Sequence, residues 1–177
     1  ERMLNRLRLS EQIFATALDG IIVTDNQGII QYVNPAFIHL SGYEAEELFG
    51  MTLRILKSGR HDDSFYQQMW DTLVSEGRWN GEVWNRRKNG EIYPESINIS
   101  AIHDHDGEVS HHVAIFSDIT RNKMIEERLR YLAHYDELTG LANRFLFNNH
   151  VELALTQALR KGRRVAILFL DLDKFKI

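Results

Sequence analysis

Residues 79–118 read WNGEVWNRRKNGEIYPESINISAIHDHDGEVSHHVAIFSD, and this stretch decides the fold. Apolar and polar residues alternate along three runs, 79–87, 91–103 and 108–118, as they do in strands with one face on a core. The connections between the runs contain KNG and DHDG, which have the composition of hairpin turns. The stretch therefore predicts three consecutive strands of an antiparallel sheet.

The residues upstream supply two more strands and a helical insert. Two short β-like runs, 20–24 and 29–33, flank the turn DNQG, and a helical region follows whose longest helix is predicted at 61–75. Apolar residues at helical spacing predict a lead-in helix over residues 1–18. The order of elements predicts an α+β domain over residues 19–120, in which the insert covers one face of a five-stranded antiparallel sheet and encloses a pocket.

The residues downstream change to a helical pattern. Ile125, Leu129 and Leu132 follow one another at spacings of four and three, as in a coiled-coil seam, and predict a coupling helix over residues 121–135. A second helix is predicted at 143–161, and residues 165–170 form an unbroken apolar run typical of a central strand. We therefore expect residues 136–177 to be the first helix and strand of an α/β domain.

Composition and charge exclude several classes of protein. The 177 residues include no cysteine, which excludes disulfides and thiolate metal sites. No apolar run approaches the roughly 18 residues of a membrane span, so we expect no membrane contact by this segment. A net charge of −4 argues against a nucleic-acid partner. Because the chain begins without Met and stops at Ile177 within a strand-like run, we expect a piece of a longer cytoplasmic protein, with any membrane anchor lying upstream.

Residues 10–120 resemble the PAS family of sensory domains, in its bacterial sensory-box form. The residues that carry this resemblance follow in order along the chain: Gly20, Ile21, Asp25, Tyr32, Val33, Asn34, Phe37, Gly42, Tyr43, Asn85, Arg87, Lys88, Asn89, Gly90, Asp118, Ile119 and Thr120. The resemblance implies a sensor whose pocket holds haem, flavin, a small acid or no ligand.

The pocket ligand stays open between a flavin, an unknown small molecule and no ligand. Leu53 lies where light-sensing flavin PAS domains carry the adduct-forming cysteine, which excludes covalent flavin photochemistry. The stretch from WNG to NRRK resembles instead the FAD-bearing redox sensors of nitrogen fixation and aerotaxis. Such a flavin would need an amide or carboxylate at its polar edge and aromatic contacts on its ring, roles that Asn85, Glu95 and Trp79 would fill if they face inward. We also expect Asn34 and Phe116 in the pocket.

Histidines offer weaker candidates for a haem or metal site. His39 and His61 are the candidates for an axial haem ligand in the helical insert, and a surface or capping role suits them better. The pairs His103 with His105 and His111 with His112 lie around a hairpin, where alternation divides each adjacent pair between the two faces. We expect no metal site there.

Residues 136–177 resemble the start of the GGDEF family of diguanylate cyclases. DELTGLANR at 136–144 matches the opening motif of that family, and FLDLDKFK at 169–176 matches its first strand. In the family, the carboxylate matching Asp171 and the carbonyl matching Leu172 hold the Mg²⁺ ions that neutralise the phosphates of GTP. The signature loop would follow Ile177, so we expect this segment alone to be no enzyme and its parent to be a diguanylate cyclase that uses Mg²⁺ and GTP.

Together these resemblances predict the sensory module of a bacterial diguanylate cyclase. The reaction joins two GTP molecules held in facing half-sites, so we expect a homodimer through the N-terminal and coupling helices that controls cyclic di-GMP synthesis by its geometry. The expected signal relay comprises Asp118, Thr120, Ile125, Leu129 and Leu132. Two alternatives stay open: a ligand-free PAS dimerisation module, and the regulatory region of a GGDEF–EAL phosphodiesterase with a degenerate cyclase domain.

Overall fold

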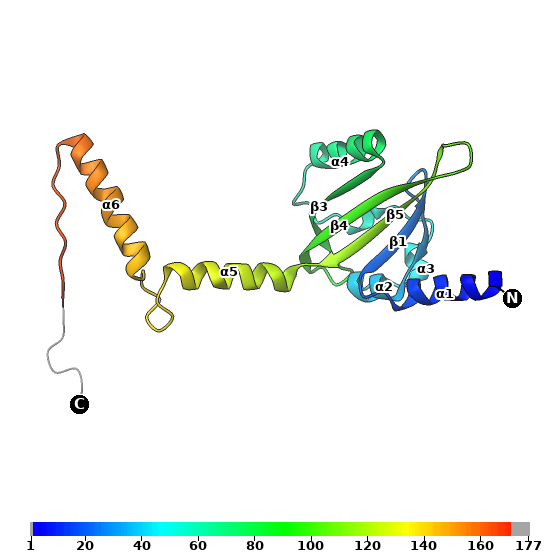
Figure 1. Ribbon diagram of the computed structural model, residues 1–177, viewed down its shortest axis with the longest axis horizontal. Helices are drawn as coiled ribbons and strands as arrows, with labels where there is room; N and C mark the ends of the chain where they lie inside the picture. Colours follow the sequence, from blue (N-terminus) through cyan, green and yellow to red (C-terminus); the bar gives the residue numbers. More distant parts are fainter. Residues whose placement is uncertain (1, 171–177) are drawn as a thin grey trace, which may run out of the picture. The chain divides into compact units, whose positions relative to one another are not determined.

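The computed structural model describes residues 2–170, which form two compact units (Figure 1). The first unit extends to Asn122 and contains the sheet and its insert. The second begins at Lys123 and contains most of one helix and all of the next. None of the helices among residues 2–170 is both long enough and apolar enough to cross a membrane.

A five-stranded antiparallel sheet forms the framework of the first unit. Its strands are β1 (Gly20–Asp25), β2 (Ile30–Val33), β3 (Arg78–Arg86), β4 (Ile92–His103) and β5 (Val109–Asp118), in the spatial order β2-β1-β5-β4-β3. The last strand therefore lies at the centre, between β1 and β4. The predicted α+β fold with a five-stranded antiparallel sheet is confirmed.

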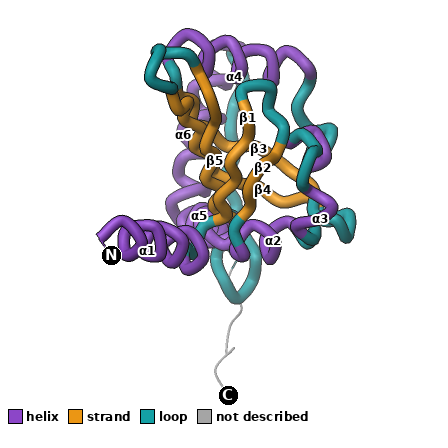
Figure 2. The backbone as a smooth tube through the Cα atoms, turned by 90° about the vertical axis from the view of Figure 1, so that its right-hand side faces the viewer, coloured by secondary structure: helices purple, strands orange, loops and turns teal. Residues whose placement is uncertain are grey.

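The insert between β2 and β3 covers one face of the sheet. It comprises α2 (Pro35–Ser41), α3 (Ala45–Leu48), the short 3₁₀ helix η1 (Leu53–Leu56) and α4 (Asp63–Glu76) (Figure 2). Side chains of the sheet and the insert share one core, whose least exposed members are Ile22, Ile30, Phe37, Leu48, Leu56, Leu73 and Phe116. Helix α4 begins where the Asp62 carboxylate accepts from Phe65 N, and it ends at Gly77, whose left-handed backbone suits glycine.

Helices flank the sheet domain in the sequence. Helix α1 (Arg2–Thr16) precedes β1 and exposes Met3, Leu4, Leu7 and Ile13. Helix α5 (Thr120–His134) follows β5 directly, and α6 (Arg144–Lys161) begins where the Asn143 side chain accepts from Leu146 N. The helices predicted at 1–18, 121–135 and 143–161 are all present.

The apolar run 165–170 differs from its prediction, because the structure forms no strand there. A central strand needs hydrogen-bonding neighbours on both sides, and no segment of residues 2–170 pairs with this one. Its side chains are correspondingly exposed, Leu168 and Phe169 among them.

Gly81 on β3 tests how tightly the inner face of the sheet is filled. A Cβ at this position would lie 2.6 Å from Cζ2 of Trp79, so Gly81→Ala must displace that ring. We expect the variant to lower the free energy of unfolding by about 1 kcal/mol in urea denaturation. Asn80→Ala, an exposed position next to it, should change stability by less than about 0.5 kcal/mol, and equal losses would contradict the packing described.

Candidate functional site

Three polar side chains form a buried cluster on the inner face of β3 and β4. Asn85 lies opposite Tyr93 in the strand register, and Glu95 follows Tyr93 by two residues, so all three face the same side. One carboxylate oxygen of Glu95 accepts from Asn85 Nδ2 at 2.7 Å, and the other accepts from the Tyr93 hydroxyl. Glu95 is 0% exposed, which makes this cluster the most deeply buried polar group of the sheet.

Burial sets the protonation of this cluster. Loss of solvent raises the pKa of Glu95 to about 6, although the hydrogen bonds from Tyr93 and Asn85 favour the charged form. Burial also raises the pKa of Tyr93. A carboxyl group with such a pKa changes between acceptor and donor near neutral pH, and it can hold a proton beside a bound ligand.

Arg87 connects the cluster to the end of the last strand. Its guanidinium lies over the Tyr93 ring at 3.6 Å from the centroid, and it also donates to the carbonyl of Leu40. The same guanidinium forms an ion pair with Asp118 at 2.6 Å. The other carboxylate oxygen of Asp118 accepts from the backbone N–H of Thr120, where α5 begins. Burial acts against the charged form of Asp118, but the bonds from Thr120 and Arg87 outweigh it and lower its pKa.

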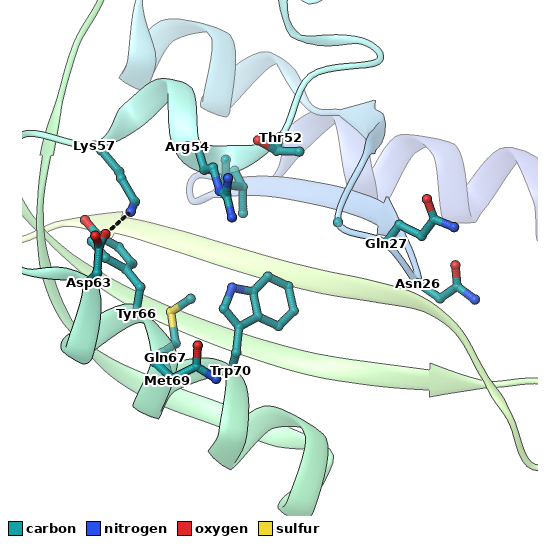
Figure 3. A pocket seen from close by; sticks show the side chains of 12 residues that line it. Asn26, Gln27, Thr52, Arg54, Lys57, Asp63, Tyr66, Gln67, Met69 and Trp70 are labelled. Atoms are coloured by element: carbon teal, nitrogen blue, oxygen red, sulfur yellow. Dashed lines mark hydrogen bonds and ion pairs between the residues drawn. The ribbon is translucent and has the colours of Figure 1, made fainter.

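A cavity of about 850 Å³ lies between the β1–β2 turn, η1 and α4. Figure 3 shows Arg54 reaching from η1 toward Trp70 on α4, while Lys57 pairs with Asp63 at 3.3 Å. The guanidinium of Arg54 makes no hydrogen bond or ion pair with any of residues 2–170. The hydroxyl of Tyr66 in the cavity wall is buried and has no hydrogen-bond partner within the described part of the chain. An unpaired cation and an unsatisfied hydroxyl suit a ligand that carries an anionic group and hydrogen-bond acceptors.

The cavity and the buried cluster meet at Lys57. The side chain of Lys57 lines the cavity, and its backbone forms an isolated bridge with Asn85. Leu53 also lines the cavity.

The five predicted pocket residues are not gathered at one point. Asn85 and Glu95 are in contact, but Trp79 lies opposite Ile99, about 13 Å further along β4, and packs edge-on against Phe65. Phe116 packs against Phe37 with ring centroids 4.9 Å apart. Contact of these residues with a ligand stays a prediction.

Asn34 has a structural role in the fold. Its Oδ1 accepts from Phe37 N and Ile21 N, and its Nδ2 donates to the carbonyls of Phe14 and Asp19. The amide thus joins the end of α1 to β1 and caps α2. Because both amide atoms are bonded to backbone, none of this geometry supports ligand binding by Asn34.

The remaining predicted positions lie in the insert, on α5 and near the C-terminus. His39 is exposed, and His61 accepts from the backbone N–H of Trp84 through Nε2. No group of metal-ligating side chains occurs within residues 2–170. Asp171 and Leu172, the predicted Mg²⁺ ligands, lie outside the described residues. The seam residues Ile125, Leu129 and Leu132 on α5 are exposed.

Tyr93, Arg54 and Tyr66 are site residues that the sequence did not identify. Alternation could have found Tyr93, since it lies two residues before Glu95 on one strand face. No comparable signal marks Arg54 and Tyr66, because their meeting depends on how η1 and α4 pack.

Family models match most of the chain. One described as "PAS domain" matches residues 18–121, and one described as "Diguanylate cyclase, GGDEF domain" matches residues 133–177. A nitrogen fixation regulatory protein of Klebsiella oxytoca is 36% identical over 111 residues, which are 63% of this chain and 22% of that protein. The probable diguanylate cyclase DgcE of Escherichia coli K12 is 26% identical over 160 residues, 89% of this chain and 14% of the relative. The chain thus spans less than a quarter of the length of these relatives.

Solved structures share the fold of the sheet domain. The PAS domain of a protein from Colwellia psychrerythraea has a TM-score of 0.62 at 25% identity, and the match covers 66% of this chain and 98% of that one. An RNA-binding light-oxygen-voltage receptor has a TM-score of 0.64 at 24% identity, with 72% of this chain and 37% of the receptor covered.

Proposed function

The chain belongs to the PAS domain family, and on that premise we propose that it is the sensory module of a bacterial diguanylate cyclase that controls cyclic di-GMP synthesis through dimer geometry. The observation that carries the proposal is the position of Arg87. One guanidinium contacts both Tyr93, beside the buried Glu95, and Asp118, which holds the first backbone N–H of α5. A change in the pocket therefore has a short polar route to the helix that leads to the cyclase segment.

This polar route can transmit a signal if the pocket and the start of α5 change together between two alternative arrangements. A ligand that binds one arrangement more tightly shifts the population toward it, by no more than its difference in affinity. Movement of the Tyr93 ring or the Glu95 carboxylate shifts the Arg87 guanidinium, and the geometry of the ion pair between Arg87 and Asp118 then changes. The relay proposed from Asp118 and Thr120 continues along α5 through Ile125, Leu129 and Leu132.

The exposed apolar seam on α5 supports a homodimer as the form in which the sensor controls the cyclase domain. Leu129 is 62% exposed, and Ile125 and Leu132 lie on the same helix face at coiled-coil spacing. A second copy of α5 would cover this face, and the exposed apolar residues of α1 offer another contact. In the complete cyclase domain, Asp171 and the Leu172 carbonyl would hold the Mg²⁺ that neutralises the GTP phosphates.

FAD is the ligand that we propose for the sensory domain. Its phosphates suit the unpaired Arg54, and its flat rings suit a cavity walled by Tyr66 and Trp70. Asn85 and Glu95 do not line the cavity but lie behind Lys57, whose backbone pairs with Asn85, so a flavin whose polar edge reached past Lys57 would meet an amide and a carboxyl group. Bound FAD would supply redox sensitivity, and these side chains would bind and orient it.

Titration of the purified protein with FAD, followed by flavin fluorescence, tests the proposal. We expect Arg54→Ala to weaken binding by about tenfold or more, since a hydrogen bond to a charged group contributes roughly 1.5 to 3 kcal/mol. Arg78→Ala removes an exposed arginine that does not line the cavity and should leave binding unchanged. Absence of flavin both after purification and after titration would instead favour a ligand-free dimerisation module.

A further inference from the structure

Residues 57–61 form a strap that joins two walls of the cavity. The strap leaves η1 at Lys57 and reaches the start of α4 directly after His61. It runs along β3, which is the edge strand of the sheet. Backbone pairing of Lys57 with Asn85, a bond from Arg86 to the Lys57 carbonyl at 2.6 Å and a bond from the Ser58 hydroxyl to the Trp84 carbonyl hold it there.

The far end of the strap is held by a histidine. The backbone N–H of Trp84 donates to Nε2 of His61 at 2.9 Å. A backbone N–H can only donate, so Nε2 must carry its lone pair and the imidazole must be uncharged. The ring also stacks on Phe65 at 4.1 Å between centroids, which fixes its orientation against α4.

We propose that His61 is a positioning residue of the ligand cavity, whose neutral ring fastens the strap to β3 and whose protonation releases it. The proposal rests on the function proposed above for the cavity. Protonation of His61 Nε2 turns this acceptor into an N–H group that faces the N–H of Trp84. The hydrogen bond between them is then lost, and the two N–H groups repel. Because the strap links η1, which carries Arg54, to α4, which carries Tyr66 and Trp70, its release loosens the cavity walls.

The charges around His61 leave this switch open to pH. The strap, the start of α4 and the facing part of β3 carry the acids Asp62, Asp63 and Glu82 and the cations Lys57, Arg60 and Arg86, and the phenol ring of Tyr66 lies edge-on to the imidazole. Asp62 follows His61 directly in the sequence, and its carboxylate is already engaged by Phe65 N and Ser64.

Amide hydrogen exchange read by NMR tests the strap without any ligand. We expect the protection of the Trp84 amide, corrected for intrinsic exchange, to fall by about tenfold between about pH 8 and pH 5. The chemical shift of this amide should follow the titration of the His61 ring. Flavin fluorescence at the same two pH values should show weaker FAD binding at the lower one.

Two variants separate the switch from a general loss of stability. His61→Gln offers a side-chain oxygen that accepts at every pH, so it should keep Trp84 protected at both pH values. His105→Gln alters an exposed histidine of the β4–β5 turn and should behave as the wild type. Trp84 protection that does not change with pH in the wild type would overturn the proposal. Failure of FAD to bind at either pH would count against the proposed flavin alone, because the amide result is independent of it.

Discussion

Replacing Arg87 by glutamine is expected to abolish the ligand-dependent change in cyclic di-GMP synthesis of the protein that carries the complete cyclase domain. Allosteric coupling of 1 to 3 kcal/mol gives responses of about fivefold or more, and we expect the variant's response to fall close to unity. The reason is that Arg87 is the one side chain among residues 2–170 that contacts Leu40, Tyr93 and Asp118 together. Glutamine is too short and carries no charge to hold all three.

Lys88→Gln is the matched control for this variant. Lys88 is the next residue and also forms an ion pair, with Glu47 at 2.6 Å, but it has no contact with Asp118. Its removal should leave the response intact. Both variants should keep the fold, which circular dichroism can verify. A full response in Arg87→Gln would mean that the signal leaves the sheet by another route.

Replacing Glu95 by glutamine is expected to stabilise the sheet domain above pH 6, although it alters a completely buried side chain. The pKa of Glu95 is raised from 4.5 to about 6, because burial disfavours the charged form. The folded protein therefore holds this proton more tightly than the unfolded chain does. As a result, the free energy of unfolding falls as the pH rises from about 4.5 through 6. The difference between these two pKa values corresponds to a loss of about 2 kcal/mol in the free energy of unfolding, since one pKa unit is worth about 1.4 kcal/mol.

Glutamine keeps an oxygen that accepts from Tyr93 or Asn85 and never becomes charged. Urea denaturation at about pH 7.5 should show a gain of roughly 1 to 2 kcal/mol, and the slope of stability between pH 4.5 and 6 should become shallower. Glu108→Gln, at an exposed turn between β4 and β5, should leave that slope unchanged. Equal pH dependence in Glu95→Gln and the wild type would show that Glu95 is not the group that titrates.

The alternation of apolar and polar residues predicts most of the fold, because this pattern depends only on neighbouring residues and on one buried sheet face. It located β3 to β5, and the register places Asn85 and Glu95 on the inner face. Alternation cannot say how far along a strand a pocket lies. The prediction from sequence therefore groups Trp79 with Asn85 and Glu95, which lie far from it on the same sheet face.

The cavity was harder to predict because its walls are irregular. Arg54 and Tyr66 lie on separate short elements, and only the packing of η1 and α4 brings them to one cavity. Asn34 was assigned to the pocket, whereas its position before Pro35 at a helix start agrees with the capping role observed. The run 165–170 reads as a strand from its apolar composition alone, but a strand exists only with partners, which residues 2–170 do not provide.

Hydrogen exchange at the start of α5, compared with and without saturating FAD, shows whether the pocket is linked to the coupling helix. We expect FAD to change the protection of the Thr120 amide and of the first turn of α5 in the wild type. Arg87→Gln should still bind FAD but should no longer show this difference. Identical protection of that turn in the free and FAD-saturated wild type would contradict the claim that the pocket is linked to the coupling helix.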